Sequence, residues 1–163
     1  HRVSEGYIVQ HGINGDPAVN AAWADAFIPD DPPFGTNVRG TFAFAAAPNS
    51  DNRTTQIFFN LGDNSRNDSD GFAVFGQVVE GMDVLDRIYS GYGEESGSGV
   101  RQGRQGPLRD GGNAFMDQEY PKLDWLIRAR LGTNEGRRSG PPTGCRGSAP
   151  VPPTCPSPSP SSP

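Results

Sequence analysis

Few residues of this chain have the types and spacing that nucleophilic or metal catalysis requires. The two histidines, His1 and His11, do not form a ligand-spaced pair, and both cysteines, Cys145 and Cys155, lie in a proline-rich C-terminal segment. The sequence contains no Gly-x-Ser-x-Gly motif, and its glycine clusters do not follow a strand and open a helix. These observations disfavour a hydrolytic triad, a metal site and a phosphate-binding loop.

The segment "DNSRNDSDG" has alternating Asp and Asn residues like a calcium loop, but it has no closing glutamate and no flanking helix pair. Adjacent acidic residues such as Asp30–Asp31 and Glu94–Glu95 lie in turn-rich stretches, where a solvated role is the simpler interpretation. What remains is Arg2, a few glutamines and many aromatic residues at strand positions. Arg2 taken alone is more typical of a surface charge than of a site.

The surrounding sequence predicts short strands that would position these residues. The strands are expected after Gly6 in "YIVQ", over 40–47, over 56–61, over 72–81 with an interruption at Gly76, and over 124–131. Helical spacing predicts one turn at Trp23 and Phe27, a helix from Met82 that ends before Gly91, and a short helix capped by Asn113. Residues 95–112 read as a glycine-rich linker.

These elements indicate a mainly β, antiparallel barrel or sandwich with a few short helices. We expect one domain over residues 1–132, followed by a disordered tail rich in proline, serine and glycine over 133–163. The two tail cysteines could pair in an oxidising compartment, but nothing in the tail requires it.

The charge and hydropathy of the chain limit the kinds of partner that it can bind. The formal net charge is −5, and residues 136–163 contribute three arginines and no acid, so the remainder is more acidic still. A domain of this charge has no basic stripe for nucleic acid. No apolar run is long enough for a membrane-spanning helix.

Three sequence blocks follow one another along the chain, and their order is more informative than any one of them alone. The blocks are "HRVSEGYIVQHG", "RGTFAFAAAPNSDNRTTQIFFNLGDN" and "GFAVFGQVVEGMDVLDRI". Together they resemble the signature blocks of the cyclophilin family of peptidyl-prolyl cis-trans isomerases, in a divergent bacterial branch. The resemblance is strong over residues 1–91 and weaker to Leu131. It implies a cyclophilin-like β-barrel and accelerated rotation about Xaa-Pro bonds during protein folding, with no cofactor and no metal.

The resemblance also assigns roles. Arg2 falls on the catalytic arginine, and Gln10 on the glutamine that orients it. The implied substrate-binding residues line a proline pocket or pair with the peptide backbone: Tyr7, Ile8, Ala45, Ala46, Ala47, Gln56, Phe58 and Phe72. Because side chains alternate along a strand, Phe58 is expected in the pocket and Phe59 on the opposite face.

The sequence departs from the family pattern at several points. Phe72 replaces a common histidine, and Ala46 replaces a common asparagine. The loop "PNSDNRTT" is longer than the usual one, so the alignment of Ala46 and Ala47 with the family's positions is left open. The tryptophan usually found at the pocket rim has no match, because "NSRND" occupies that region.

Family members also have further strands and a helix before the "HRV" block. We therefore expect a partial domain that lacks its first strands and first helix, with exposed sheet edges and weak or no activity by itself.

Two alternatives remain open at this stage: a proline-peptide binding module without catalysis, and a fragment without a stable fold. The expected partners are proline-containing peptides and unfolded proteins, with cyclosporin-like cyclic peptides as a further possibility, and the chain is expected to be a monomer. Both the bacterial cytoplasm and the periplasm are compatible with the sequence.

Overall fold

The structure is a computed structural model in which residues 1–47, 50–92 and 105–132 are described. Residues His1–Leu126 form one compact unit, and a second unit begins at Ile127. The prediction of a disordered tail over 133–163 lies outside the described residues. Among those that are described, no helix has the length and apolar character needed to cross a bilayer.

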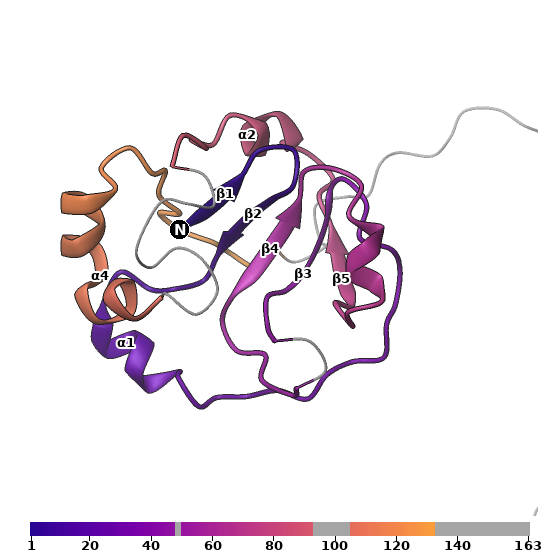
Figure 1. Cartoon of the computed structure of the whole chain (residues 1–163), viewed down its shortest axis with the longest axis horizontal. Coiled ribbons are helices and arrows are strands. Elements are labelled where there is room, and N and C mark those ends of the chain that lie inside the picture. The colour runs from indigo at the N-terminus through magenta and orange to yellow at the C-terminus, as the bar shows by residue number, and fades with distance from the viewer. Residues whose placement is uncertain (48–49, 93–104, 133–163) are drawn as a thin grey trace, which may run out of the picture. The chain divides into compact units, whose positions relative to one another are not determined.

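The compact unit is built on one antiparallel sheet. Its strands are β1 (Arg2–Ser4), β2 (Ile8–His11), β3 (Thr41–Phe44), β4 (Ile57–Asn60) and β5 (Val74–Gln77). Figure 1 shows them in the order β1-β2-β4-β3-β5. The predicted antiparallel architecture is confirmed, although the strands are shorter than predicted. Within the described residues the sheet is open, with β1 and β5 as its edges, and does not close into a barrel.

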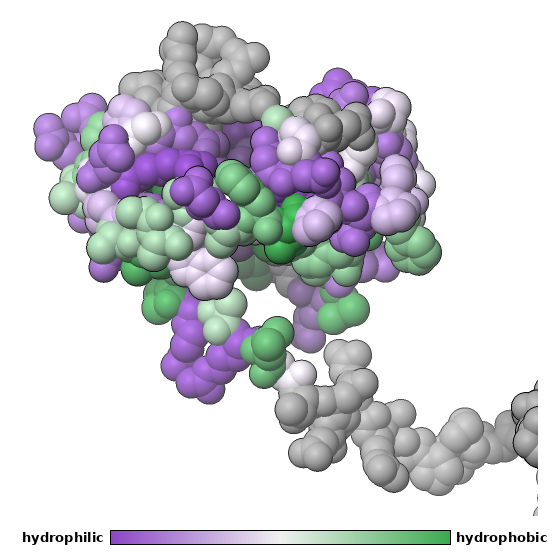
Figure 2. Space-filling view, turned by 90° about the horizontal axis from the view of Figure 1, so that it is seen from below, coloured by the Kyte–Doolittle hydropathy of each residue, from purple (hydrophilic) through white to green (hydrophobic). Residues whose placement is uncertain are grey.

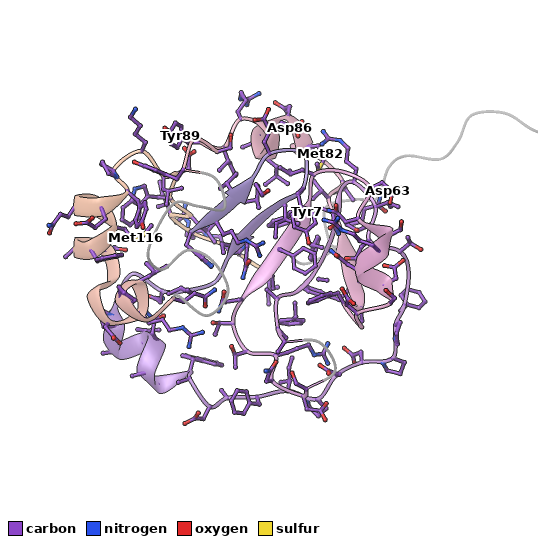
Figure 3. The ribbon with its side chains drawn as sticks, viewed as in Figure 1. Tyr7, Asp63, Met82, Asp86, Tyr89 and Met116 are labelled. Atoms are coloured by element: carbon purple, nitrogen blue, oxygen red, sulfur yellow. The ribbon has the colours of Figure 1, made fainter. Side chains whose placement is uncertain are left out.

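Short helices surround the sheet: α1 (Pro17–Ala22), the 3₁₀ helix η1 (Ser65–Asp68), α2 (Met82–Asp86) and α4 (Gly106–Glu119). Helices α1 and α4 are far apart in the sequence but pack side by side (Figure 1). In Figure 3, Met82 and Asp86 lie on α2, and Met116 lies on α4. The predicted helix beginning at Met82 is confirmed.

Two helix predictions need correction. The apolar pair Trp23 and Phe27 does not share a helical turn; the helix lies earlier and ends at Ala22. The side chain of Asp16 caps it by accepting a hydrogen bond from the amide of Ala18 at 2.9 Å, and Pro17 occupies the first turn. These start signals outweigh the i, i+4 apolar spacing.

The second correction concerns the linker predicted up to residue 112, because α4 begins at Gly106 and Asn113 is not its cap. Burial of Leu108 against Met116 and Tyr120 favours helix despite the glycines. Gly112 has φ +55°, which breaks α4 into two segments, so a helical segment does begin near Asn113. A side chain at Gly112 would also collide with the carbonyl of Gly15.

The strand predicted over 124–131 is wrong. Residues 123–132 have no helix or strand, and the apolar residues in the run are exposed, Ile127 at 95% and Leu131 at 103%. Alternation of apolar and polar residues indicates a strand only where a neighbouring strand completes the hydrogen-bond ladder. No described strand pairs with this segment.

Strand register separates the sheet into two faces. Arg2 pairs with Gln10, Gln10 with Phe58, and Phe58 with Ala43, so these residues form one row across β1, β2, β4 and β3. Their neighbours along each strand point to the opposite face, where Val3, Val9 and Leu61 pack with Met82, Leu85 and Ile88.

The opposite face also has a row of aromatic rings. Phe59 stacks on His11 at 5.6 Å and contacts Phe42 at 5.2 Å, and Phe42 meets Phe75 edge to face at 4.9 Å. The predicted close approach at Gly76 is confirmed, because a side chain there would overlap the ring of Phe42, and the β3–β5 register shifts beside it.

A buried asparagine network ties the loops to the sheet. The amide nitrogen of Asn60, which is fully buried, donates to Asn37 at 3.0 Å and to the hydroxyl of Thr41 at 2.9 Å, and its oxygen accepts from Asn64 at 2.8 Å. Asn64 also donates to the backbone oxygen of Tyr7 at 2.8 Å. Asn37 in turn donates to the backbone oxygen of Phe72 at 2.8 Å. The network therefore fixes two segments that will line the site.

We expect Asn60→Ala to lower the free energy of unfolding by about 2–3 kcal/mol, because it removes the buried amide to which Asn37, Thr41 and Asn64 are hydrogen-bonded. Urea unfolding followed by circular dichroism measures the change. The exposed Asn113 offers a control, and Asn113→Ala should change stability much less. Equal stability of the Asn60 variant and the parent chain would show that the network does not hold the fold together.

Candidate active site

Every residue that the sequence singled out for the site lines one cavity of about 380 Å³. The cavity contains Arg2, Tyr7, Ile8, Gln10, Ala45, Ala46, Ala47, Gln56, Phe58 and Phe72. The structure brings them together from β1, β2 and β4, from the residues just before β2 and β4, and from the segments that follow β3 and η1. Strand register explains most of this convergence, because the row through Arg2, Gln10 and Phe58 faces the cavity.

The polar side of the cavity is a chain of side-chain hydrogen bonds. Arg2 Nη1 donates to Gln10 Oε1 at 3.0 Å, and Gln10 Nε2 donates to Gln56 Oε1 at 2.9 Å. Both glutamines are buried, at 6% and 7% exposure, so their amides need these partners. Because a guanidinium can only donate, Arg2 fixes which way the Gln10 amide points, and Gln10 fixes that of Gln56.

The chain of bonds continues beyond the predicted residues to α4. Gln56 Nε2 donates to Gln105 Oε1 at 2.9 Å, and Gln105 Nε2 donates back at 3.2 Å. Arg109 Nη2 approaches the same Gln105 oxygen at 3.4 Å. We call this set, Arg2, Gln10, Gln56, Gln105 and Arg109, the amide row.

The apolar side of the cavity is a socket of aromatic and aliphatic side chains. Buried Ile8 and Phe58 pack with Tyr7 and Phe72, and the rings of Phe58 and Phe72 meet edge to face at 5.5 Å. Phe59 lies on the opposite face with Phe42, as the alternation predicted. The socket itself is therefore lined by aromatic and aliphatic side chains.

Tyr7 lies near the loop end of the β1–β2 hairpin (Figure 3). Its hydroxyl donates to Asn67 Oδ1 at 3.4 Å, and the guanidinium of Arg66 lies 4.9 Å from the ring centre. The "NSRND" segment, where the usual tryptophan has no match, thus contributes Asn67 to the cavity wall.

The alanines after β3 form another wall with the loop that follows them. The amide of Ala45 donates to the backbone oxygen of Gln56 at 2.9 Å, and the amide of Ala47 donates to Asn52 Oδ1 at 3.1 Å. Asn52 and Thr54 line the cavity beside them.

The segment between α1 and β3 closes the cavity through Ala24 and Phe27. Arg53, 7% exposed, attaches this segment by ion pairs with Asp30 at 3.2 Å and Asp31 at 2.9 Å. The Arg53 guanidinium also lies 5.4 Å from the ring centre of Phe44. Figure 2 views the molecule from the side of this segment, where hydrophilic and apolar side chains are interspersed.

Sequence reasoning missed part of the lining: Ala24, Phe27, Asn52, Thr54, Asn67, Gln105 and Arg109. Gln105 and Arg109 were missed because the glycines around them favoured a linker, although Pro107 at a helix start was an available signal. Phe27 lines the cavity next to Ile28, whose backbone pairs with the distant Arg53, and no local pattern reveals that pairing.

Charge around the cavity is unevenly distributed. Its described lining contains two arginines, Arg2 and Arg109, and no carboxylate. His11 lies outside this lining, and burial lowers its pKa, with a further lowering from the positive N-terminus. No cluster of three His, Cys, Asp or Glu side chains suitable for a metal occurs among the described residues.

Comparison with known proteins gives a consistent result. Residues 1–105 match the family model "Cyclophilin type peptidyl-prolyl cis-trans isomerase/CLD". A peptidyl-prolyl cis-trans isomerase of Acinetobacter baylyi is 51% identical over 57 residues, which cover 32% of this chain and 30% of that protein. Peptidyl-prolyl cis-trans isomerase B of Escherichia coli is 31% identical over 137 residues, which cover 79% of this chain and 72% of that protein.

Among solved structures, a cyclophilin type isomerase of Cryptosporidium parvum aligns with a TM-score of 0.43 and 19% identity, over 55% of this chain and 59% of that one. The matched region thus spans from under a third to about three quarters of the length of these relatives. The family model covers most of the chain, including every residue of the predicted site. The chain belongs to the cyclophilin type peptidyl-prolyl cis-trans isomerase family.

Proposed function

We propose that this chain binds proline-containing peptides in the described cavity and accelerates cis-trans isomerisation of their Xaa-Pro bonds. The sequence led us to expect weak or no activity of the chain by itself, but all ten predicted site residues line one cavity, which favours activity. One observation supports this most directly: the buried amides of Gln10 and Gln56 orient the Arg2 guanidinium beside an apolar socket on the same sheet face. The proposal assigns Arg2 and Gln10 to catalysis, and the socket and alanine residues to substrate binding.

The chemistry requires little beyond positioning and charge. An Xaa-Pro amide rotates slowly because resonance gives its C–N bond partial double-bond character, with a barrier of about 18–20 kcal/mol. Cis and trans differ by only about 0.5–1 kcal/mol, so an isomerase needs to stabilise only the twisted state. A donor placed at the proline nitrogen interacts with the lone pair that twisting localises there, and the planar forms lack that lone pair. This is preferential binding of the transition state.

Arg2 suits the donor role because its guanidinium stays charged and its orientation is fixed. The bond to Gln10 restrains one nitrogen, and Gln10 is itself restrained by Gln56. A donor that is already oriented does not reorganise when the amide twists, so its interaction with the substrate is not offset by that cost.

The socket suits the proline ring. Ile8, Phe58 and Phe72 offer apolar surface, and Phe72 supplies a ring where many family members have a histidine. With the ring held, the carbonyl that precedes proline is the part that swings. The half-buried backbone after β3, at Ala45 to Ala47, lines the cavity, and the proposal assigns this segment to pairing with an extended peptide.

We extend the proposal to unfolded proteins as clients and to cyclosporin-like cyclic peptides as ligands of the same cavity, with the chain acting as a monomer. Competition between a cyclic peptide of that type and a linear proline peptide tests whether they share the cavity. Sedimentation of the full chain tests its oligomeric state.

We expect Arg2→Ala to lower kcat/KM for isomerisation of a short Xaa-Pro peptide about 100-fold, because it removes the donor to the proline nitrogen. Exchange NMR measures the rate at equilibrium. Arg87→Ala removes a charge from the exposed pair with Asp83 and serves as the matched control.

Thermal unfolding of both variants shows whether the fold survives. Equal exchange rates for Arg2→Ala and the parent chain, both folded, would overturn the catalytic assignment. Binding without any acceleration in the parent chain would instead indicate a non-catalytic peptide-binding module.

Gln10 acts through Arg2, so the two residues should not contribute independently. We expect Gln10→Ala to lower kcat about tenfold while changing KM little, and to have almost no further effect in the Arg2→Ala background. A double-mutant cycle by exchange NMR measures this coupling. Gln77, exposed on the edge strand β5, provides the control substitution. Additive effects of the two substitutions would contradict the positioning role.

A further inference from the structure

The proposed reaction uses one arginine of the cavity, and the second, Arg109, has no role in it. Arg109 lies in the first turn of α4 and is half-buried in the cavity wall. Its backbone is anchored on both sides: its amide donates to the oxygen of Gln105 at 3.0 Å, and its oxygen accepts from Asn20 on α1 at 3.3 Å. The base of this side chain is therefore held in place at the cavity.

The Arg109 guanidinium differs in its partners from three other arginines of the described residues. Arg39, Arg53 and Arg87 each form an ion pair with an aspartate, at 2.6 to 3.2 Å. Within the described part of the chain, Arg109 pairs with no carboxylate, and its side chain makes one long bond, to the neutral amide of Gln105. A guanidinium has five donor hydrogens, so most of its capacity is available to a ligand.

The Gln105 oxygen also accepts from Gln56 at 2.9 Å, so it orients Arg109 from the same row that orients Arg2. The cavity thus presents one cation at each end of the amide row. Because the described lining contains no acidic side chain, a substrate carboxylate would meet two positive groups there and no repulsion from the wall.

We propose that Arg109 determines substrate specificity by pairing with an acidic side chain of the peptide close to the isomerised proline. This inference rests on the proposed function and names its substrate class: Xaa-Pro segments with Glu or Asp within two residues of proline. Arg2 is assigned to the proline amide, so Arg109 is the cation that remains for a flanking carboxylate. The planar fork of arginine matches a carboxylate with two parallel hydrogen bonds.

The test uses blocked peptides in which one Glu occupies, in turn, each of the two positions on either side of a single proline. A matching series has Gln at the same positions, so each pair differs only in charge. Exchange NMR gives kcat/KM, and chemical-shift titration gives Kd, for the full chain with each peptide. The readout is the Glu-to-Gln ratio at each position.

At one or two positions we expect a ratio of about three- to fivefold in low salt, the range typical of a half-exposed ion pair. The ratio should fall toward one in 0.5 M NaCl. Arg109→Gln should abolish the preference, Arg109→Lys should retain part of it, and Arg87→Gln should leave it unchanged. Arg87 directly follows α2 and does not line the cavity.

A ratio of one at every position in the parent chain, or an unchanged ratio in Arg109→Gln, would overturn the inference while leaving isomerisation of the Gln peptides intact. If no peptide is isomerised but the Kd values show the Arg109-dependent preference, the specificity role stands and catalysis fails. If no peptide of either series binds, the proposed function and this inference fail together.

Discussion

The site depends on hydrogen bonds between buried side-chain amides. Gln10 and Gln56 are almost completely shielded from water, and a buried amide without partners costs on the order of 1–3 kcal/mol. Each therefore holds its neighbour in a single orientation, from Arg2 on the edge strand to Gln105 before α4. The orientation of the Arg2 guanidinium beside the socket follows from this constraint.

The rest of the fold supports the row from two sides. The antiparallel register places Arg2, Gln10 and Phe58 in line across three strands, so the polar row and the apolar socket share one face. The asparagine network around Asn60 then fixes the loops that supply Tyr7 and Phe72. The buried asparagine network thereby holds the apolar wall formed by Tyr7 and Phe72 in place. The shape of the cavity is therefore set by hydrogen bonds between neutral groups, with few charged groups in its lining.

The sequence predicted the sheet face of the site and failed on the parts that come from tertiary contacts. Alternation correctly separated Phe58 from Phe59, because side-chain direction on a strand follows from local geometry. Gln105 and Arg109 were not found, since α4 forms only when Leu108 and Met116 are buried together, despite the helix-breaking glycines. The alternating apolar and polar residues before Leu131 led us to predict a strand that does not form, because no described strand pairs with them.

In the proposed complex, the guanidinium of Arg2 meets the proline amide while the proline ring fills the socket. An experimental structure of the chain with a bound proline peptide tests this most directly. We expect the proline ring to pack against Phe58 and Phe72, with an Arg2 nitrogen within hydrogen-bond distance, roughly 3 Å, of the proline nitrogen. A peptide seated on the opposite sheet face, or a proline ring outside the cavity, would contradict it.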